Sequence, residues 1–176
     1  MEVIDNAIND DELKIIQEIM LGKAFPWFFN NTTIDPDTVS GVNDFQFTHI
    51  FYSTVDGCGY NESNYFNILK PIIKKLECRV LIRTKANLRT IAPEKDMIAG
   101  WHRDYETNNT QTAIFYVNSN NGYTIFKESK EKVESVENRL VVFPTNLEHC
   151  GVSCTDNNQR VVINFNFIGQ ELWVLF

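Results

Sequence analysis

From residue 79 onward the chain consists of short alternating segments, and this pattern limits the possible folds more than any other feature of the sequence. In the first segment, apolar Ala86 and Leu88 alternate with polar Asn87 and Arg89, as in a half-buried strand. Turn signals rich in asparagine and glycine separate the segments. The eight segments are 79–89, 97–102, 111–117, 123–126, 132–136, 139–143, 149–153 and 160–168. They predict a mainly β protein with a double-stranded β-helix, that is, a cupin-like jelly roll.

The first part of the chain is expected to supply helices that pack on one sheet of this core. Apolar side chains recur at helical spacing in residues 10–20, and either Asn9 or Asp10 can cap this helix. A second helix is predicted over residues 63–77. Pro71 should either kink this helix or mark its true start.

The length of 176 residues fits a single domain over 1–176. We expect helical support and substrate-side loops in 1–78 and the jelly-roll core in 79–168. The formal net charge of −7 argues against general nucleic-acid binding, which needs a net cationic face. No segment approaches the roughly 18–20 apolar residues of a membrane span, so no membrane partner is expected.

The cysteines and the start of the chain favour a cytoplasmic protein. Residues 1–5 have no cationic stretch before an apolar one, as a secretory signal would have. None of the four cysteines forms a CxxC pair, and we interpret them as reduced thiols. Zinc binding by Cys150 and Cys154 would need two more ligands, and only His149 is near in sequence, so a zinc site is disfavoured.

Three residues have the composition of a metal site. His102 and Asp104 stand two positions apart at the end of the second predicted strand, so both side chains point to one side of an extended chain. His149 begins the seventh predicted strand. Two imidazoles and one carboxylate form the facial triad of non-haem Fe(II) oxygenases, which leaves coordination positions for a bidentate cosubstrate and O2. The third histidine, His49, has no such partners and is expected to be structural.

Arg160 follows His149 by eleven residues, at the start of the last predicted strand. The strand alternates, so that Arg160 shares a face with Asn164, whereas Val161 and Ile163 lie on the other face. The apolar face can pack against the helices, and the opposite face then directs the guanidinium toward the interior. A guanidinium binds a carboxylate in bidentate fashion. A surface cation is the alternative interpretation.

Together, His102-x-Asp104, His149 and Arg160 resemble the 2-oxoglutarate- and Fe(II)-dependent oxygenase superfamily. The chain is most similar to the prolyl 4-hydroxylase-like branch, and the resemblance covers roughly residues 79–168. The spacing of all four positions makes the resemblance specific, whereas an isolated HxD motif would be weak.

The resemblance implies a role for each matching residue. The two histidines and Asp104 match the iron ligands, which are the catalytic residues of the superfamily. Arg160 matches the basic residue that pairs with the far carboxylate of 2-oxoglutarate. Tyr116 matches a tyrosine that donates a hydrogen bond to the same carboxylate, although a buried core tyrosine is the alternative. No tyrosine of the first barrel strand matches the one some relatives use, and Asn87 or Arg89 could take its place as a cosubstrate contact.

The implied activity is that of a dioxygenase with Fe(II) and the cosubstrates 2-oxoglutarate and O2, and with ascorbate as a candidate reductant. Such an enzyme hydroxylates a C–H bond and releases succinate and CO2. The substrate could be a prolyl residue of a protein or peptide, or a free amino acid, nucleobase or other small molecule. The alternative from another class is a non-catalytic jelly-roll protein that binds a metal.

Residues 70–89 reverse the overall acidity, with seven cations and one acid. Arg83, Lys85 and Arg89 share one strand face, which could look into the barrel mouth. There they could attract an anionic substrate. The alternative is a solvated face, which we favour for the lysines of the preceding helix.

Overall fold

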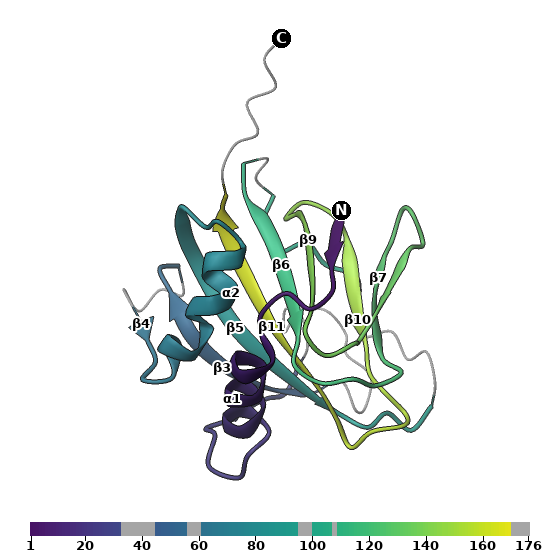
Figure 1. The fold of residues 1–176 in the computed structure, drawn as a ribbon. Coiled ribbons are helices and arrows are strands. Elements are labelled where there is room, and N and C mark those ends of the chain that lie inside the picture. Colours follow the sequence, from purple (N-terminus) through teal and green to yellow (C-terminus); the bar gives the residue numbers. More distant parts are fainter. Residues whose placement is uncertain (33–44, 56–60, 95–99, 107–108, 170–176) are drawn as a thin grey trace.

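The computed structural model describes residues 1–32, 45–55, 61–94, 100–106 and 109–169. Within them the chain forms two antiparallel sheets and few helices, consistent with a jelly roll (Figure 1). The helices are α1 (Asp10–Met20), the short 3-10 helix η1 (Phe66–Leu69) and α2 (Lys70–Lys75). The strands are β1 (Glu2–Ile4), β2 (Phe28–Asn30), β3 (Gln46–Ser53), β4 (Asn61–Glu62), β5 (Val80–Thr90), β6 (Gln111–Tyr116), β7 (Tyr123–Phe126), β8 (Lys132–Glu134), β9 (Arg139–Pro144), β10 (His149–Val152) and β11 (Gln159–Ile168).

The larger sheet has the strand order β1-β9-β6-β11-β5-β3-β2, with β4 paired to β3, and the smaller sheet has the order β10-β7-β8. The chain before residue 79 therefore contributes strands as well as the expected helices. Strand β1 pairs with β9, and β3 and β2 extend the sheet beyond β5. Of the predicted strand 97–102, residues 97–99 lie outside the described residues, and His102 forms an isolated bridge with His149.

Helix α1 begins and packs as its sequence predicts. The Asn9 side chain accepts a hydrogen bond from the backbone N–H of Glu12 (2.9 Å), and the Glu12 carboxylate accepts one from the backbone N–H of Asn9 (3.1 Å). Leu13, Ile16 and Met20 are buried in the cluster that joins the helices to the larger sheet. Within the described ranges, no helix combines the length and apolar character needed to cross a membrane.

The second helix is shorter than the predicted span of residues 63–77. Pro71 lies in the first turn of α2, where its missing N–H is no loss and its fixed φ suits a helix start. The preceding turn is the 3-10 helix η1, and Glu77, with a φ of 48°, follows the end of α2. The prediction that Pro71 marks the true start is therefore confirmed, whereas the wider limits were wrong.

Strand β11 separates two layers of packing. Val161, Ile163 and Phe165 are buried in the same cluster as the apolar side chains of α1 and α2. On the other face, Val162 packs in a second cluster with residues of β6, β7 and β9. Figure 1 shows the helices near β5 and β11, away from β7 and β10. The space that holds the site is therefore on the face of β11 opposite the helices.

Candidate functional site

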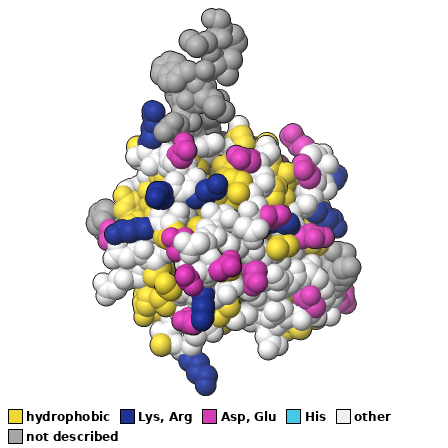
Figure 2. All heavy atoms as spheres, viewed as in Figure 1, with side chains coloured by type: hydrophobic (Ala, Val, Ile, Leu, Met, Phe, Trp, Pro, Cys, Tyr) yellow, Lys and Arg dark blue, Asp and Glu magenta, His cyan; other side chains and the backbone are white. Residues whose placement is uncertain are grey.

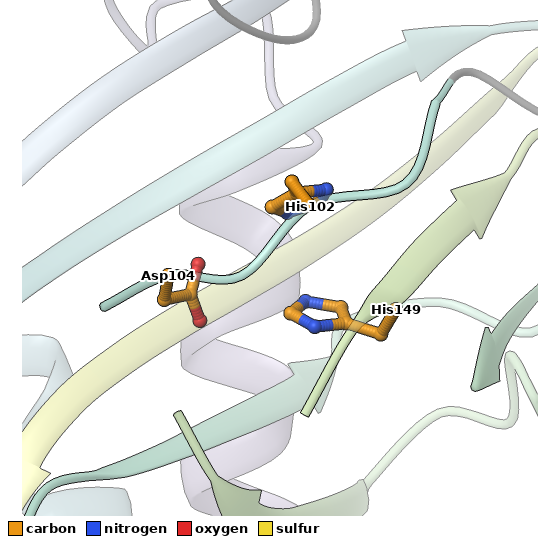
Figure 3. Close-up of side chains that lie close together, drawn as sticks. All are labelled: His102, Asp104 and His149. Atoms are coloured by element: carbon orange, nitrogen blue, oxygen red, sulfur yellow. The ribbon is translucent and has the colours of Figure 1, made fainter. Parts of the chain in front are cut away.

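The structure brings His102, Asp104 and His149 together, as Figure 3 shows. One ligand atom from each residue lies within 4.8 Å of the others. The backbone N–H groups of His102 and His149 each donate to the other residue's carbonyl, at 3.0 and 2.9 Å, and the ring centroids are 4.5 Å apart. This backbone bridge fixes the two imidazoles side by side.

Each imidazole of this pair lies against the carbonyl group two residues before it. His102 Nδ1 is 3.5 Å from the Gly100 oxygen, and His149 Nδ1 is 3.0 Å from the Leu147 oxygen. A proton on Nδ1 satisfies these carbonyls and leaves the Nε2 lone pair for a metal ion. Burial and the nearby charge of His149 lower the pKa of His102, and this favours the neutral form that coordination requires.

The carboxylate of Asp104 is held by two donors from neighbouring strands of the larger sheet. Its Oδ2 accepts hydrogen bonds from Thr112 Oγ1 on β6 and from Asn166 Nδ2 on β11, the latter at 3.1 Å. Asn166 Nδ2 also donates to Thr112 Oγ1 at 3.1 Å. Because both contacts use Oδ2, Oδ1 remains for a metal ion. Sequence reasoning did not identify Thr112 and Asn166 as site residues, although strand parity places Asn166 on the face of Arg160.

The three residues line a cavity of about 680 Å³, which is within the range of small-molecule sites. Its floor is the inner face of β3, β5 and β11, so the register of these strands decides which side chains enter it. Arg160 and Asn87 both line this cavity, and Asn87 is the cross-strand neighbour of Val162 on β11. Asn87 Oδ1 is buried without a hydrogen-bond partner, so it is available to a ligand donor.

Arg160 is a buried cation that faces this cavity, with only 4% of its surface exposed. Its Nε donates to Ser135 Oγ (2.9 Å) and its Nη2 donates to Thr124 Oγ1 (3.2 Å). No carboxylate in the described residues forms an ion pair with it. Burial lowers the pKa of Arg160, an electrostatic cost that a bound carboxylate would offset. The site is therefore suited to an anion.

Gly122 leaves room for the Arg160 side chain. A Cβ at Gly122 would lie 2.7 Å from Arg160 Cδ and 2.8 Å from the backbone oxygen of Val152. A larger residue would have to push either the arginine or the backbone of β10. Neither Gly122 nor Ser135 could be identified from the sequence, because no spacing relates them to Arg160.

Tyr116 is completely buried, and it lies behind the cavity lining. Its hydroxyl donates to Thr124 Oγ1 at 2.8 Å, and the Arg160 guanidinium carbon is 5.6 Å from its ring centroid. Thr124 does line the cavity and accepts from both residues, so its own hydroxyl hydrogen is left for another acceptor. A direct contact of Tyr116 with a carboxylate stays a prediction; in the structure, Thr124 Oγ1 links the Tyr116 hydroxyl to Arg160.

His49 is not part of the described cavity lining, although its neighbours Thr48 and Ile50 on β3 are, because successive side chains of a strand point to opposite faces. Its Nδ1 is 2.9 Å from the Pro26 oxygen and its Nε2 is 2.8 Å from Ser63 Oγ. Phe25 and Phe51 pack against the ring, with centroid distances of 4.6 and 4.8 Å. Burial lowers the pKa of His49. These contacts support a structural role, since they tie β3 to two loops.

The donor set fits a divalent iron. Two neutral imidazole nitrogens and one carboxylate oxygen on one side of a cavity leave the other coordination positions open. The buried Arg160, which lacks a carboxylate partner among the described residues, fits the far carboxylate of 2-oxoglutarate in the same cavity. Both groups implied by the resemblance therefore match residues that the chain provides.

No family model matches the sequence, and no curated protein matches it. Solved structures do match. An oxidoreductase of the 2OG-Fe(II) oxygenase family from Burkholderia pseudomallei has a TM-score of 0.66 at 14% identity, over 94% of this chain and 84% of that chain. A viral collagen prolyl hydroxylase from Paramecium bursaria Chlorella virus-1 has a TM-score of 0.57 at 12% identity, over 96% of both chains. The α-ketoglutarate-dependent epimerase SnoN from nogalamycin biosynthesis has a TM-score of 0.64 at 8% identity, over 95% of this chain and 77% of that chain.

These identities are low, so the likeness concerns the fold. It extends over more than nine-tenths of this chain in each case. The chain therefore has the fold of the 2-oxoglutarate- and Fe(II)-dependent oxygenases, among which are prolyl hydroxylases.

Proposed function

We propose that the protein is an Fe(II)- and 2-oxoglutarate-dependent dioxygenase, which hydroxylates a C–H bond of its substrate and releases succinate and CO2. One observation carries the proposal: a buried Arg160, without a carboxylate partner among the described residues, faces the same cavity as His102, Asp104 and His149. A metal site with a purely structural role would not need a carboxylate receptor beside it. This favours the enzyme over a non-catalytic metal-binding protein.

One set of residues would bind the metal, and another would orient the cosubstrate. His102 and His149 would bind through Nε2, and Asp104 through Oδ1, while hydrogen bonds at their other atoms keep the ligands in place. When bound, Fe(II) supplies the oxidative chemistry with O2. Arg160 would anchor the far carboxylate of 2-oxoglutarate, and the Thr124 hydroxyl would donate to the same carboxylate.

The substrate could be a prolyl residue of a peptide or a small molecule. The viral collagen prolyl hydroxylase among the similar structures supports the first, and the epimerase from nogalamycin biosynthesis supports the second. The cavity itself favours a polar small molecule, because its only large apolar side chains are Ile50, Ile114 and Val162 within the described lining. We further propose that the enzyme works in the cytoplasm, with ascorbate as an auxiliary reductant.

The test is turnover of 2-oxoglutarate to succinate by the Fe(II)-loaded protein, with slow turnover expected even without substrate. Arg160→Met should lose this turnover together with 2-oxoglutarate binding, and His102→Ala should lose it together with metal binding. Binding is measured anaerobically with Mn(II) by calorimetry, which does not depend on turnover. If wild type neither binds 2-oxoglutarate in a metal-dependent manner nor exceeds His102→Ala in succinate formation, the proposed function is wrong.

A further inference from the structure

The described lining of the cavity is strongly cationic, although the protein is acidic. It contains five cationic side chains and one carboxylate, Asp104. The five cations are Arg83, Lys85, Arg89, Arg103 and Arg160. On the face that Figure 2 views, by contrast, acidic and basic side chains are interspersed. A concave, single-sign surface such as this lining concentrates ligands of the opposite charge.

Three of these cations have an assigned role or a contact within the protein. Arg160 faces the far carboxylate of 2-oxoglutarate. Arg89, its cross-strand neighbour, donates from Nη1 to the backbone oxygen of Gly151 at 3.4 Å. Arg103 forms a salt bridge to Glu148, with Nη2 and Oε2 3.7 Å apart. Fe(II) and a 2-oxoglutarate dianion add no net charge, so the described lining keeps its excess of cations over carboxylates in the loaded site. The other two cations of this lining are Arg83 and Lys85.

Arg83 and Lys85 lie at the metal end of the cavity. Arg83 is the cross-strand neighbour of Asn166, which hydrogen-bonds the metal ligand Asp104. Lys85 is the cross-strand neighbour of Asn164, which precedes Asn166 by two residues on β11. Both cations also interact with other groups of the chain, so a bound anion would join or replace those contacts. On β11, the partner of Arg83 is six residues from Arg160 and the partner of Lys85 is four residues from it.

The groups between these two ends suit a hydrophilic ligand. Asn87 Oδ1 and Asn164 Oδ1 are buried without hydrogen-bond partners, and both residues line the cavity. A buried acceptor that is left unsatisfied is unfavourable, so a ligand with hydroxyl or amine donors would be favoured here. A neutral prolyl ring offers neither these donors nor a negative charge.

We propose that the substrate to be oxidised is a small hydrophilic anion, whose carboxylate or phosphate group binds Arg83 and Lys85 on β5. This inference rests on the proposed function, because it assumes that 2-oxoglutarate occupies the Arg160 end of the same cavity. The anionic group would lie on the side of the metal opposite Arg160. The carbon to be oxidised would then lie between the two anchors, near the open positions of the metal.

The test compares matched neutral and anionic probes on the protein loaded with Mn(II) and saturating 2-oxoglutarate. The probe pairs are serine and phosphoserine, glutamine and glutamate, and adenosine and adenosine monophosphate. We expect the anionic member of at least one pair to bind at least tenfold more tightly than its neutral partner, with an affinity that falls as salt is added. The glutamate and phosphoserine arms distinguish a carboxylate from a phosphate. Calorimetry gives the dissociation constants without turnover.

Two neutralising substitutions and a matched control locate the binding group. Arg83→Gln and Lys85→Gln should each raise the dissociation constant of the anionic probe about tenfold or more, and raise that of 2-oxoglutarate less. Arg83→Lys should retain part of the affinity. Arg79→Gln removes the same charge from an exposed residue just before β5 that is not part of the described lining, and it should leave probe binding unchanged.

The outcomes separate this inference from the proposed function. If 2-oxoglutarate does not bind, both fail. If 2-oxoglutarate binds but no anionic probe binds better than its neutral partner, or if a neutral prolyl peptide stimulates turnover more than every anion, only this inference is overturned. It is also overturned if Arg83→Gln and Lys85→Gln weaken the binding of 2-oxoglutarate as much as the binding of the probe, since both cations would then bind the cosubstrate.

Discussion

Thr112→Val should weaken metal binding although Thr112 is not a ligand. The threonine is fully buried, and its hydroxyl donates to Asp104 Oδ2 while accepting from Asn166. Valine keeps the branched shape but removes a donor to a charged acceptor, a contact worth about 1.5–3 kcal/mol. Outer-shell changes of this kind typically cost about 10–100-fold in metal affinity. We therefore expect the dissociation constant of Mn(II) to rise about 10–100-fold, that is, by about 1.4–2.8 kcal/mol.

Thr84→Val is the matched control for this substitution. Thr84 is also fully buried on the larger sheet, but its Oγ1 has no hydrogen-bond partner. Removing an unsatisfied hydroxyl should leave the Mn(II) affinity unchanged and raise the free energy of unfolding by about 1 kcal/mol. Mn(II) titration by calorimetry and urea unfolding of the metal-free protein measure the two effects. Equal Mn(II) affinities of Thr112→Val and wild type, within twofold, would refute the role assigned to Thr112.

Three further predictions concern the anion anchor, the structural histidine and the cap of α1. Arg160→Met should raise the dissociation constant of 2-oxoglutarate at least about 30-fold, since losing one partner of a buried charge pair costs about 2–5 kcal/mol. Calorimetry on the Mn(II)-loaded protein measures this constant. Burial lowers the pKa of His49, so below the unfolded value of about 6.5 the unfolded chain binds more protons. The contribution of His49 to stability is therefore complete above that pH and is lost as the pH falls through the folded pKa. When the free energy of unfolding is measured with urea from pH 7.5 to pH 5, it should fall less for His49→Gln than for wild type. Asn9→Ala removes the side-chain cap of α1 and should lower the free energy of unfolding by about 1 kcal/mol in the same assay, whereas no change would contradict the capping box.

The strand pattern and the pairing of His102 with Asp104 could be predicted because each depends on local periodicity, whereas His149 was assigned to the site by its residue type and by the resemblance. Alternation with period two places Arg160 and Asn164 on one face of β11, and the same rule lets His102 and Asp104 converge. Capping by Asn9 also follows from residue types within one helical turn. These features need no knowledge of which strands pair.

The contacts that support the site could not be predicted, because they depend on strand pairing over long sequence separations. Ser135 and Thr124 reach Arg160 across 25 and 36 residues, and Asn166 reaches Asp104 across 62. Single hydroxyl and amide residues are common in turns and strands, so no spacing marks them. The limits of the second helix have a local cause instead: Pro71 indicated its start, whereas helical periodicity over residues 63–77 did not show that the helix would end at Lys75.

Strand β11 couples the stability of the core to the geometry of the site. Val161 and Ile163 pack under the helices, while Arg160 faces the cavity on the opposite side. A slip of one residue in the pairing with β5 would turn Arg160 into the apolar layer, where an unpaired charge would cost several kcal/mol. The apolar packing therefore selects the register that places Arg160 beside Arg89. Two like charges held side by side oppose each other until an anion binds, so 2-oxoglutarate should stabilise the folded protein by more than its contacts with Arg160 alone provide.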